Sequence, residues 1–184
     1  ERRNPLKATT YGVGEMVADA VKRGCHEIVM GIGGSATCDG GRGMVEALDD
    51  CRCLDMDCQV IAACDVNNPL FGKNGAAYVF APQKGATPEQ VETLDGRLRA
   101  FAKATEQAGR ATPELAFSSG AGAAGGLGYA LLAYLNANLH SGIDIMLDIA
   151  GFDAAIKDAD LVITGEGKSD EQTLMGKVPY GVLK

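Results

Sequence analysis

Apolar and polar positions along the first fifty residues predict the order helix, strand, glycine-rich loop, helix. Apolar residues recur at helical spacing over residues 13–21, and Gly24 is a natural end for that helix. Residues 28–32 form a short apolar run that is typical of a buried strand. A glycine-rich stretch follows, and residues 44–48 then return to helical spacing.

The same alternation continues through the rest of the chain. Further apolar runs of strand length lie at residues 59–66, 78–80 and 161–164. Further helical patterns lie at residues 91–102, 129–135, 143–149 and from about Thr173 onward. Thr87, Pro88 and Gln90 form a capping box that should begin the first of these helices. Alternating strands and helices predict an α/β fold with a sheet that is at least partly parallel.

Three glycine-rich loops each follow a strand or turn and lead into a helix. They lie at residues 31–41 (GIGGSATCDGG), 120–128 (GAGAAGGLG) and 164–170 (TGEGKSD). Glycine lets the backbone approach a ligand, and N–H groups at a helix start attract phosphate or carboxylate. Because ligands gather at the carboxyl ends of parallel strands, we expect the three loops to converge on one ligand-binding cleft.

The chain does not fully match either common nucleotide-binding motif. The loop at residues 31–36 satisfies the loose dinucleotide pattern G-x-G-x-x-A, but Gly40 and Gly41 fall where the following helix should be rising. The triplet GKS at residues 167–169 resembles the end of a P-loop, but Val162 stands where that motif requires its first glycine.

Carboxylates accompany the loops. Asp39 lies in the first loop, Asp65 ends a strand, and Glu166 and Asp170 lie in the third loop. Such acids can cap helices or face solvent, but a phosphoryl-transfer site also needs them as Mg²⁺ ligands and as a base for the attacking hydroxyl. We expect Asp39 to be the base or hydroxyl-orienting group, and Glu166 or Asp170 to hold the metal.

Three lysines are candidate charge partners for a phosphate or a substrate carboxylate: Lys84, Lys168 and Lys177. The two histidines and the serines of the chain match no catalytic motif that we recognise, and no G-x-S-x-G elbow is present.

Charge and cysteine usage exclude several classes of protein. The net charge is −7 and Lys and Arg form no run, which argues against nucleic-acid binding. No apolar stretch has the length of a membrane span and no signal peptide is visible, so a cytoplasmic location is expected. The six cysteines lie within the first 64 residues without paired C-x2-C motifs, and are expected to be reduced thiols rather than a zinc site.

Six segments resemble, in the same order, landmarks of the bacterial-type glycerate kinase family. They are GIGGSATCDGG, CDVNNPLFG, PQKGATPEQV, GAGAAGGLG, SGIDIMLD and LVITGEGKSDEQTLMGKVPYGV, and the likeness begins at RNPLKATTYGVGE. The resemblance implies ATP-dependent, Mg²⁺-assisted phosphorylation of D-glycerate by a two-domain α/β protein with its active site between the domains. A homo-oligomer is compatible with it.

The resemblance also implies roles for individual residues. Catalytic roles fall to Asp39, Asp65, Glu166 and Asp170, with Glu166 and Asp170 as metal ligands. Nucleotide contacts fall to the glycine loops, at Gly33, Gly34, Ser35, Gly120, Gly122, Gly125 and Gly126, to which we add Lys177 as a charge partner. Cys38 departs from the family, which usually has Asn at that position.

The family's opening segment and its closing helices and strands have no counterpart here. The chain is therefore expected to be a fragment: residues 1–184 are mostly the inserted second domain of a glycerate kinase, a Rossmann-like mixed-sheet domain. The last ~20 residues should return toward the first domain. The stretch between residues 48 and 59 is shorter than the family pattern.

Two other classes of function stay open from the residues alone. One is an NAD-dependent oxidoreductase that uses the loop at residues 31–36, and the other is a non-catalytic domain that binds an anionic metabolite. The ligand that raises the melting temperature separates the three possibilities. ATP with Mg²⁺ should stabilise a kinase, NAD an oxidoreductase, and the metabolite alone a non-catalytic binding domain.

Overall fold

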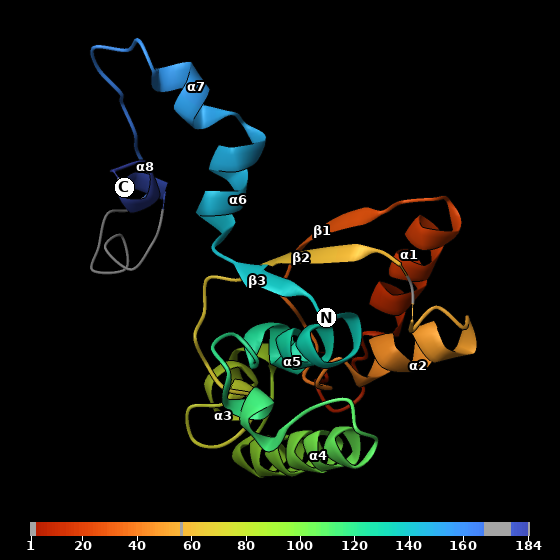
Figure 1. Ribbon diagram of the computed structural model, residues 1–184. Coiled ribbons are helices and arrows are strands. Elements are labelled where there is room, and N and C mark those ends of the chain that lie inside the picture. The colour runs from red at the N-terminus through yellow and green to blue at the C-terminus, as the bar shows by residue number, and fades with distance from the viewer. Residues whose placement is uncertain (1–2, 56, 168–177, 184) are drawn as a thin grey trace. The chain divides into compact units, whose positions relative to one another are not determined.

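The computed structural model describes residues 3–55, 57–167 and 178–183 (Figure 1). The chain divides into two units, Glu1–Leu139 and His140–Lys184. Within the described residues, every helix is too short or too polar to cross a membrane.

The described residues form a small three-stranded sheet. Its strands are β1 (Glu27–Gly31), β2 (Gln59–Ala63) and β3 (Asn138–His140), in the order β1-β2-β3. β1 and β2 are parallel, with Glu27 opposite Gln59 and Gly31 opposite Ala63. Both strands therefore end at the same edge of the sheet, and the predicted α/β class with a parallel sheet is confirmed.

Helices make up most of the remaining structure of the first unit. They are α1 (Tyr11–Lys22), α2 (Arg42–Asp50), α3 (Ala76–Phe80), α4 (Pro88–Gln107) and α5 (Ala123–Leu135), with 3₁₀ turns η1 (Pro82–Lys84) and η2 (Pro113–Phe117). The capping box at Thr87 is confirmed, since Thr87 Oγ1 accepts from the Gln90 N–H and the Gln90 side chain accepts from the Thr87 N–H.

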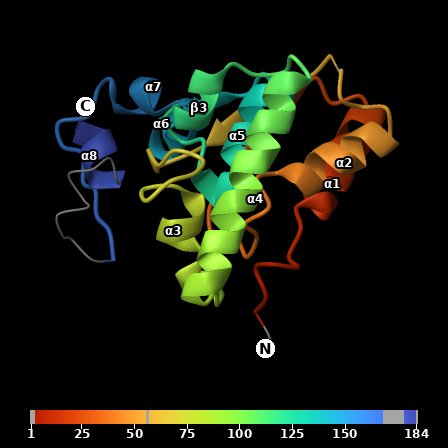
Figure 2. The ribbon, with the colours of Figure 1, turned by 90° about the horizontal axis from the view of Figure 1, so that it is seen from below.

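Helix α5 lies at the centre of the first unit. Its Leu127 and Leu131 belong to a buried cluster with Val60 of β2, whereas its Tyr129 belongs to a second cluster with Leu98 of α4. Figures 1 and 2 show α5 beside α4, and Figure 1 shows it between α4 and the sheet. One almost wholly apolar helix therefore joins the two cores, which is why its residues are buried on nearly every side.

Two predicted strands are wrong. Residues 78–80 lie in helix α3, where Ala76 and Ala77 are buried while Tyr78 and Val79 are exposed, and a five-residue apolar run gives too little periodicity to separate helix from strand. Residues 161–164 have no regular secondary structure, and Leu161 is largely exposed. A strand needs a hydrogen-bonded neighbour, and no strand of the described residues pairs with this run.

The second unit contains α6 (Gly142–Ile149), α7 (Phe152–Ile156) and α8 (Val178–Leu183). Helix α6 confirms the helix predicted near residues 143–149. The helix start predicted near Thr173 lies outside the described residues. The assignment of this chain mainly to an inserted domain stays a prediction, since the division at residue 139 does not test it.

The glycine-rich segment at residues 120–128 packs backbone to backbone on the first glycine loop. Gly125 has a φ of +72°, and its carbonyl accepts a hydrogen bond from the Gly40 N–H at 3.0 Å. A Cβ atom on Gly125 would collide with the carbonyl oxygen of Thr37 and would lie 2.8 Å from the Cα atom of Cys38. The two glycine-rich segments can approach this closely only because the side chain is missing.

We therefore predict that Gly125→Ala lowers the free energy of unfolding by about 2–4 kcal/mol, from the strained φ and the overpacked contact together. Gly96→Ala is the matched control, because Gly96 lies within α4 and a Cβ atom there meets no atom within 4 Å. This control should gain about 0.5–1 kcal/mol of helix propensity. Urea denaturation measures both, and similar stabilities for the two variants would contradict the packing argument.

Candidate functional site

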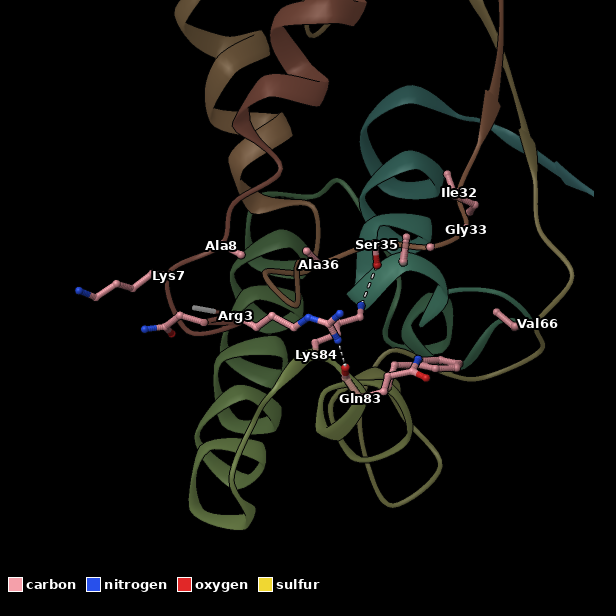
Figure 3. A pocket seen from close by; sticks show the side chains of 14 residues that line it. Arg3, Lys7, Ala8, Ile32, Gly33, Ser35, Ala36, Val66, Gln83 and Lys84 are labelled. Carbon is pink, nitrogen blue, oxygen red and sulfur yellow. Dashed lines mark hydrogen bonds between the residues drawn. The ribbon is translucent and has the colours of Figure 1, made fainter. Parts of the chain in front are cut away.

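The loops after β1 and β2 leave the sheet at the same edge. The Ile32 N–H donates to the Ala63 carbonyl at 3.3 Å, which extends the pairing by one residue. Beyond that point Gly33, Gly34 and Ser35 line a cavity of about 940 Å³, to which Val66 contributes from the loop after β2 (Figure 3). The cavity therefore lies at the carboxyl ends of two parallel strands, where α/β folds place their ligands.

The backbone of the first loop is open toward this cavity. Gly33 and Gly34 are exposed, and a Cβ atom on either would meet no atom within 4 Å. Gly34 has a φ of +61°. In the described part of the chain, no hydrogen bond takes its donor from the N–H of Gly33, Gly34 or Ser35. These N–H groups are thus available to an acceptor that enters the cavity.

Lys84 is the buried cation of the cavity. It ends η1 and is only 7% exposed. Its Nζ donates to Ser35 Oγ and to the Thr37 carbonyl, both at 2.7 Å, so it is tied to the first glycine loop (Figure 3). Burial lowers the pKa of Lys84, because the cavity wall solvates an ammonium less well than water does.

Arg3 and Lys7 also line the cavity, and Arg3 Nη1 donates to the Gln83 carbonyl at 3.2 Å. The sequence alone did not single out these two residues, since an isolated Arg or Lys carries no motif. It gave Lys84 only as one of three lysines, and the contacts to Ser35 and Thr37 are what distinguish it.

The carboxylate of Asp39 joins the starts of two helices. Its Oδ2 accepts from the Thr10 N–H and the Thr10 hydroxyl, both at 2.8 Å, and from the Gly43 N–H at 3.2 Å. Its Oδ1 accepts from the Gly41 N–H at 3.2 Å. The Thr10 hydroxyl in turn accepts from the Met44 N–H at 3.0 Å. Asp39 therefore satisfies donors at the N-termini of both α1 and α2.

Asp39 lines a different cavity from Gly33, Gly34 and Ser35. This second cavity has a volume of about 680 Å³, and Cys38, Arg42 and Arg97 also line it. The first half of the glycine loop and its second half thus face separate spaces. The role of Asp39 as a base stays a prediction, and in this structure its carboxylate accepts four hydrogen bonds, three on Oδ2 and one on Oδ1.

Of the other predicted acids, Asp65 and Glu166 lie among the described residues. Asp65 is exposed, two residues after β2, and its neighbour Val66 lines the cavity of Lys84. Glu166 belongs to the second unit and is half-buried. Asp170, Lys168 and Lys177 lie outside the described residues. The convergence of the third loop with the first therefore stays a prediction.

The glycines at 120, 122, 125 and 126 are buried against other parts of the chain. A Cβ on Gly122 would collide with the Pro69 carbonyl, and one on Gly126 would lie 2.7 Å from the Gly40 Cα. These glycines therefore have a packing role in this structure, and their predicted contact with a nucleotide stays a prediction. The sequence does not separate the two roles, since a glycine run serves either.

Cys38, which follows Thr37 in the first glycine loop, is 1% exposed. Burial raises its pKa to about 11, although the nearby Lys84 charge acts in the opposite direction, so the thiol is protonated at neutral pH. Among the described residues, no group of three or more His, Cys, Asp and Glu side chains is placed to hold a metal ion.

The hydrogen bonds of Asp39 lead to a stability prediction. Asp39→Ala should lower the free energy of unfolding by about 2–4 kcal/mol, because it leaves several helix N-terminal donors without their acceptor. Thr10→Val should cost about 1–2 kcal/mol, since it removes the hydroxyl between Met44 and Asp39. Glu46→Gln, which alters only an exposed pair with Arg42, is the control and should change stability by less than about 0.5 kcal/mol. Chemical denaturation tests the ranking, and an Asp39→Ala effect as small as the control would refute it.

Comparison with known proteins gives relatives along the full chain. A protein of Bacillus subtilis named glycerate kinase is 44% identical over 212 residues, covering 100% of this chain and 55% of that protein. A protein of Escherichia coli named glycerate 2-kinase is 42% identical over 209 residues, covering 99% of this chain and 54% of that protein. The chain thus spans about half the length of the curated relatives it matches.

A solved structure and a family model give the same result as these relatives. A crystal structure from Salmonella typhimurium LT2, provisionally assigned as glycerate kinase 2, is 44% identical and superposes with a TM-score of 0.84 over 98% of this chain and 55% of that one. The model of the glycerate kinase family matches in two segments, residues 1–57 and 50–184, which overlap at residues 50–57, between α2 and β2. The chain belongs to the glycerate kinase family.

Proposed function

We propose that the protein containing this chain transfers the γ-phosphoryl group of ATP to a hydroxyl of D-glycerate, with Mg²⁺ as cofactor. The observation that carries the proposal is the match to relatives named glycerate kinase along the whole chain, glycine loops included. The cavity at the carboxyl ends of β1 and β2, with its buried Lys84, supports a site for anionic substrates.

The proposed reaction exchanges one P–O bond for another and moves one proton. A hydroxyl oxygen of glycerate attacks the γ-phosphorus, the bond from the γ-phosphorus to the bridging oxygen breaks, and ADP leaves. The hydroxyl proton passes to a base. Catalysis of this step is mostly positioning and stabilisation of negative charge, and cationic groups such as Lys84 and Arg3 suit the second task.

Carboxylate oxygens are the donors that Mg²⁺ prefers, so the acids of this chain fit the metal chemically. We propose Glu166 and Asp170 as its ligands, with Asp65 as a further catalytic acid beside the cavity. When bound, Mg²⁺ would neutralise charge on the β- and γ-phosphates.

Asp39 is the proposed base or hydroxyl-orienting group. Its Oδ2 accepts three hydrogen bonds, from the Thr10 N–H, the Thr10 hydroxyl and the Gly43 N–H, whereas Oδ1 accepts one, from the Gly41 N–H. Oδ1 therefore keeps a lone pair to which a substrate hydroxyl can donate. Holding the loop is a second role that the same residue can fill, and the two roles are separable by experiment.

An ADP-release assay tests the proposed function. The complete protein should release ADP only when ATP, Mg²⁺ and D-glycerate are all present, and NMR of the product should show a phosphoglycerate and identify the phosphorylated hydroxyl. The 184-residue chain is assayed in parallel. Absence of ADP release from the complete protein would refute the proposal, and stabilisation by NAD instead would favour an oxidoreductase.

Two variants in this assay separate the roles of Asp39. Asp39→Asn and Thr10→Val both weaken the contact between α1 and α2, but only Asp39→Asn removes a base. If Asp39 is the base, its variant should lose roughly 10²- to 10⁴-fold in turnover while Thr10→Val, measured at a temperature where it is folded, stays near the unaltered protein. Equal turnover in the two variants would contradict the role of Asp39 as a base and would leave it only the role of holding the loop.

A further inference from the structure

We propose that Cys25 and Cys58 form a reversible disulfide when the protein meets a small-molecule disulfide such as oxidised glutathione. All six cysteines are free thiols in this structure. Cys25 and Cys58 lie just before β1 and β2, at the amino ends of these strands, whereas the cavity of Lys84 lies at their carboxyl ends. The inference goes beyond the proposed function and does not rest on it, because it concerns the other end of the strands.

The pairing of β1 with β2 makes the two cysteines neighbours (Figure 1). Glu27 lies opposite Gln59, and the Gln59 N–H donates to the His26 carbonyl at 2.9 Å, so the two segments stay paired just before β1 begins. Cys25 precedes His26 and Cys58 precedes Gln59, which places the cysteines diagonally across the pair. Paired strands lie about 4.8 Å apart and rise about 3.3 Å per residue, so a diagonal of one residue is roughly 6 Å between Cα atoms. Disulfides join Cα atoms that are about 4.4–6.8 Å apart.

The end of α1 fixes the position of Cys25. Gly24 has a φ of +86°, and the Cys25 N–H donates to the Ala20 carbonyl at 3.1 Å, an arrangement that commonly closes a helix. Cys25 therefore lies in the closing turn of α1, before the regular strand. The alternation of side chains between the two faces of a sheet does not yet apply there, so the diagonal offset does not force Cys25 and Cys58 onto opposite faces.

The two thiols also interact electrostatically. The pKa of Cys58 is raised above its usual value, first by burial and next by the Cys25 thiol. The effect of Cys25 exceeds that of Asp57, the residue directly before Cys58, and that of Glu27. Because Coulomb interactions weaken with distance, this order agrees with the short separation that the strand pairing gives.

Exposure distinguishes this pair from the other cysteines. Four cysteines belong to, or pack against, the two buried clusters of the first unit: Cys38, Cys51, Cys53 and Cys64. Cys25 is exposed, and Cys58 is half-buried with its Sγ donating to the Gln59 carbonyl at the long distance of 3.7 Å. An oxidant in solution therefore reaches Cys25 first, and Cys58 is the thiol beside it that can complete the bridge.

The oxidation balances as two thiol–disulfide exchanges. The Cys25 thiolate attacks one sulfur of the small disulfide, the S–S bond of that molecule breaks, and one thiol leaves. The Cys58 thiolate then attacks the Cys25 sulfur and expels the second thiol. Together the two cysteines lose two protons and two electrons, which reduce the small disulfide to two thiols. Since only a thiolate attacks, the raised pKa of Cys58 predicts that the bridge closes faster as the pH rises above neutrality.

The disulfide would close a loop that contains β1, the first glycine loop and α2. A cross-link of this kind lowers the conformational entropy of the unfolded chain, which stabilises the folded state. We expect the oxidised chain to melt about 5–10 °C above the reduced chain.

The test is thiol alkylation of the 184-residue chain after incubation with excess oxidised glutathione. The reaction is quenched with acid and the chain is alkylated in denaturant, so that the intact mass counts the remaining thiols. The unaltered chain should lose two alkylation sites without retaining glutathione, regain both with dithiothreitol, and show the rise in melting temperature.

Single variants identify the pair. Cys25→Ser and Cys58→Ser should each prevent the bridge, and Cys58→Ser should instead retain one glutathione on Cys25. Cys53→Ser is the matched control, because Cys53 lies in the same connection between α2 and β2 but packs against a buried cluster. This control should form the bridge as readily as the unaltered chain.

Three results would overturn the proposal: alkylation of all six cysteines, glutathione retained on the unaltered chain without a bridge, or a bridge that persists in Cys25→Ser or Cys58→Ser. None of these measurements uses turnover. Failure of the ADP-release assay therefore leaves the disulfide standing, and absence of the bridge leaves the proposed kinase standing.

Discussion

The close approach of two glycine-rich backbones is the constraint on which this structure depends. The segment at residues 120–128 lies against residues 37–41 at distances that exclude a Cβ atom on Gly125 or Gly126. The contact lies in the first turn of α5, where residues 124–126 have positive φ, and α5 contributes residues to both hydrophobic clusters of the first unit. On its other side the same loop is held by Asp39, whose carboxylate joins it to Thr10 and α1. The second half of the loop is therefore fixed from two directions, while Gly33 and Gly34 remain open.

Fixing one half of the loop gives the other half its chemistry. Lys84 reaches the loop from η1, 49 residues further along the chain, and its two hydrogen bonds place a positive charge beside exposed backbone N–H groups. The protein as a whole is acidic, with a net charge of −7, yet this cavity is lined by Arg3, Lys7 and Lys84. Local charge, rather than the total, decides which ligands a cavity attracts.

Local features of the sequence predicted the elements well, and non-local contacts account for most of what it missed. The capping box at Thr87 and the strand before Gly31 are determined by neighbouring residues, so the sequence was sufficient for them. Residues 78–80 were misassigned as a strand because a short apolar run does not reveal its packing partners. The bond between Asp39 and Thr10 spans 29 residues, and no spacing rule indicates it. The glycine pattern between a strand and a helix identified the first loop, but only the structure separates its open half from its packed half.

The most direct test of this account compares the two glycine-rich segments in solution. Backbone amide resonances of the chain are followed by NMR during titration with D-glycerate and with Mg-ATP. The account predicts that the resonances of Gly33, Gly34 and Ser35 shift in a saturable way with at least one of these ligands, while those of Gly125 and Gly126 shift little. Saturable shifts at Gly125 and Gly126 with no change at Gly33, Gly34 and Ser35 would contradict it, because the ligand would then bind the segment assigned here to packing.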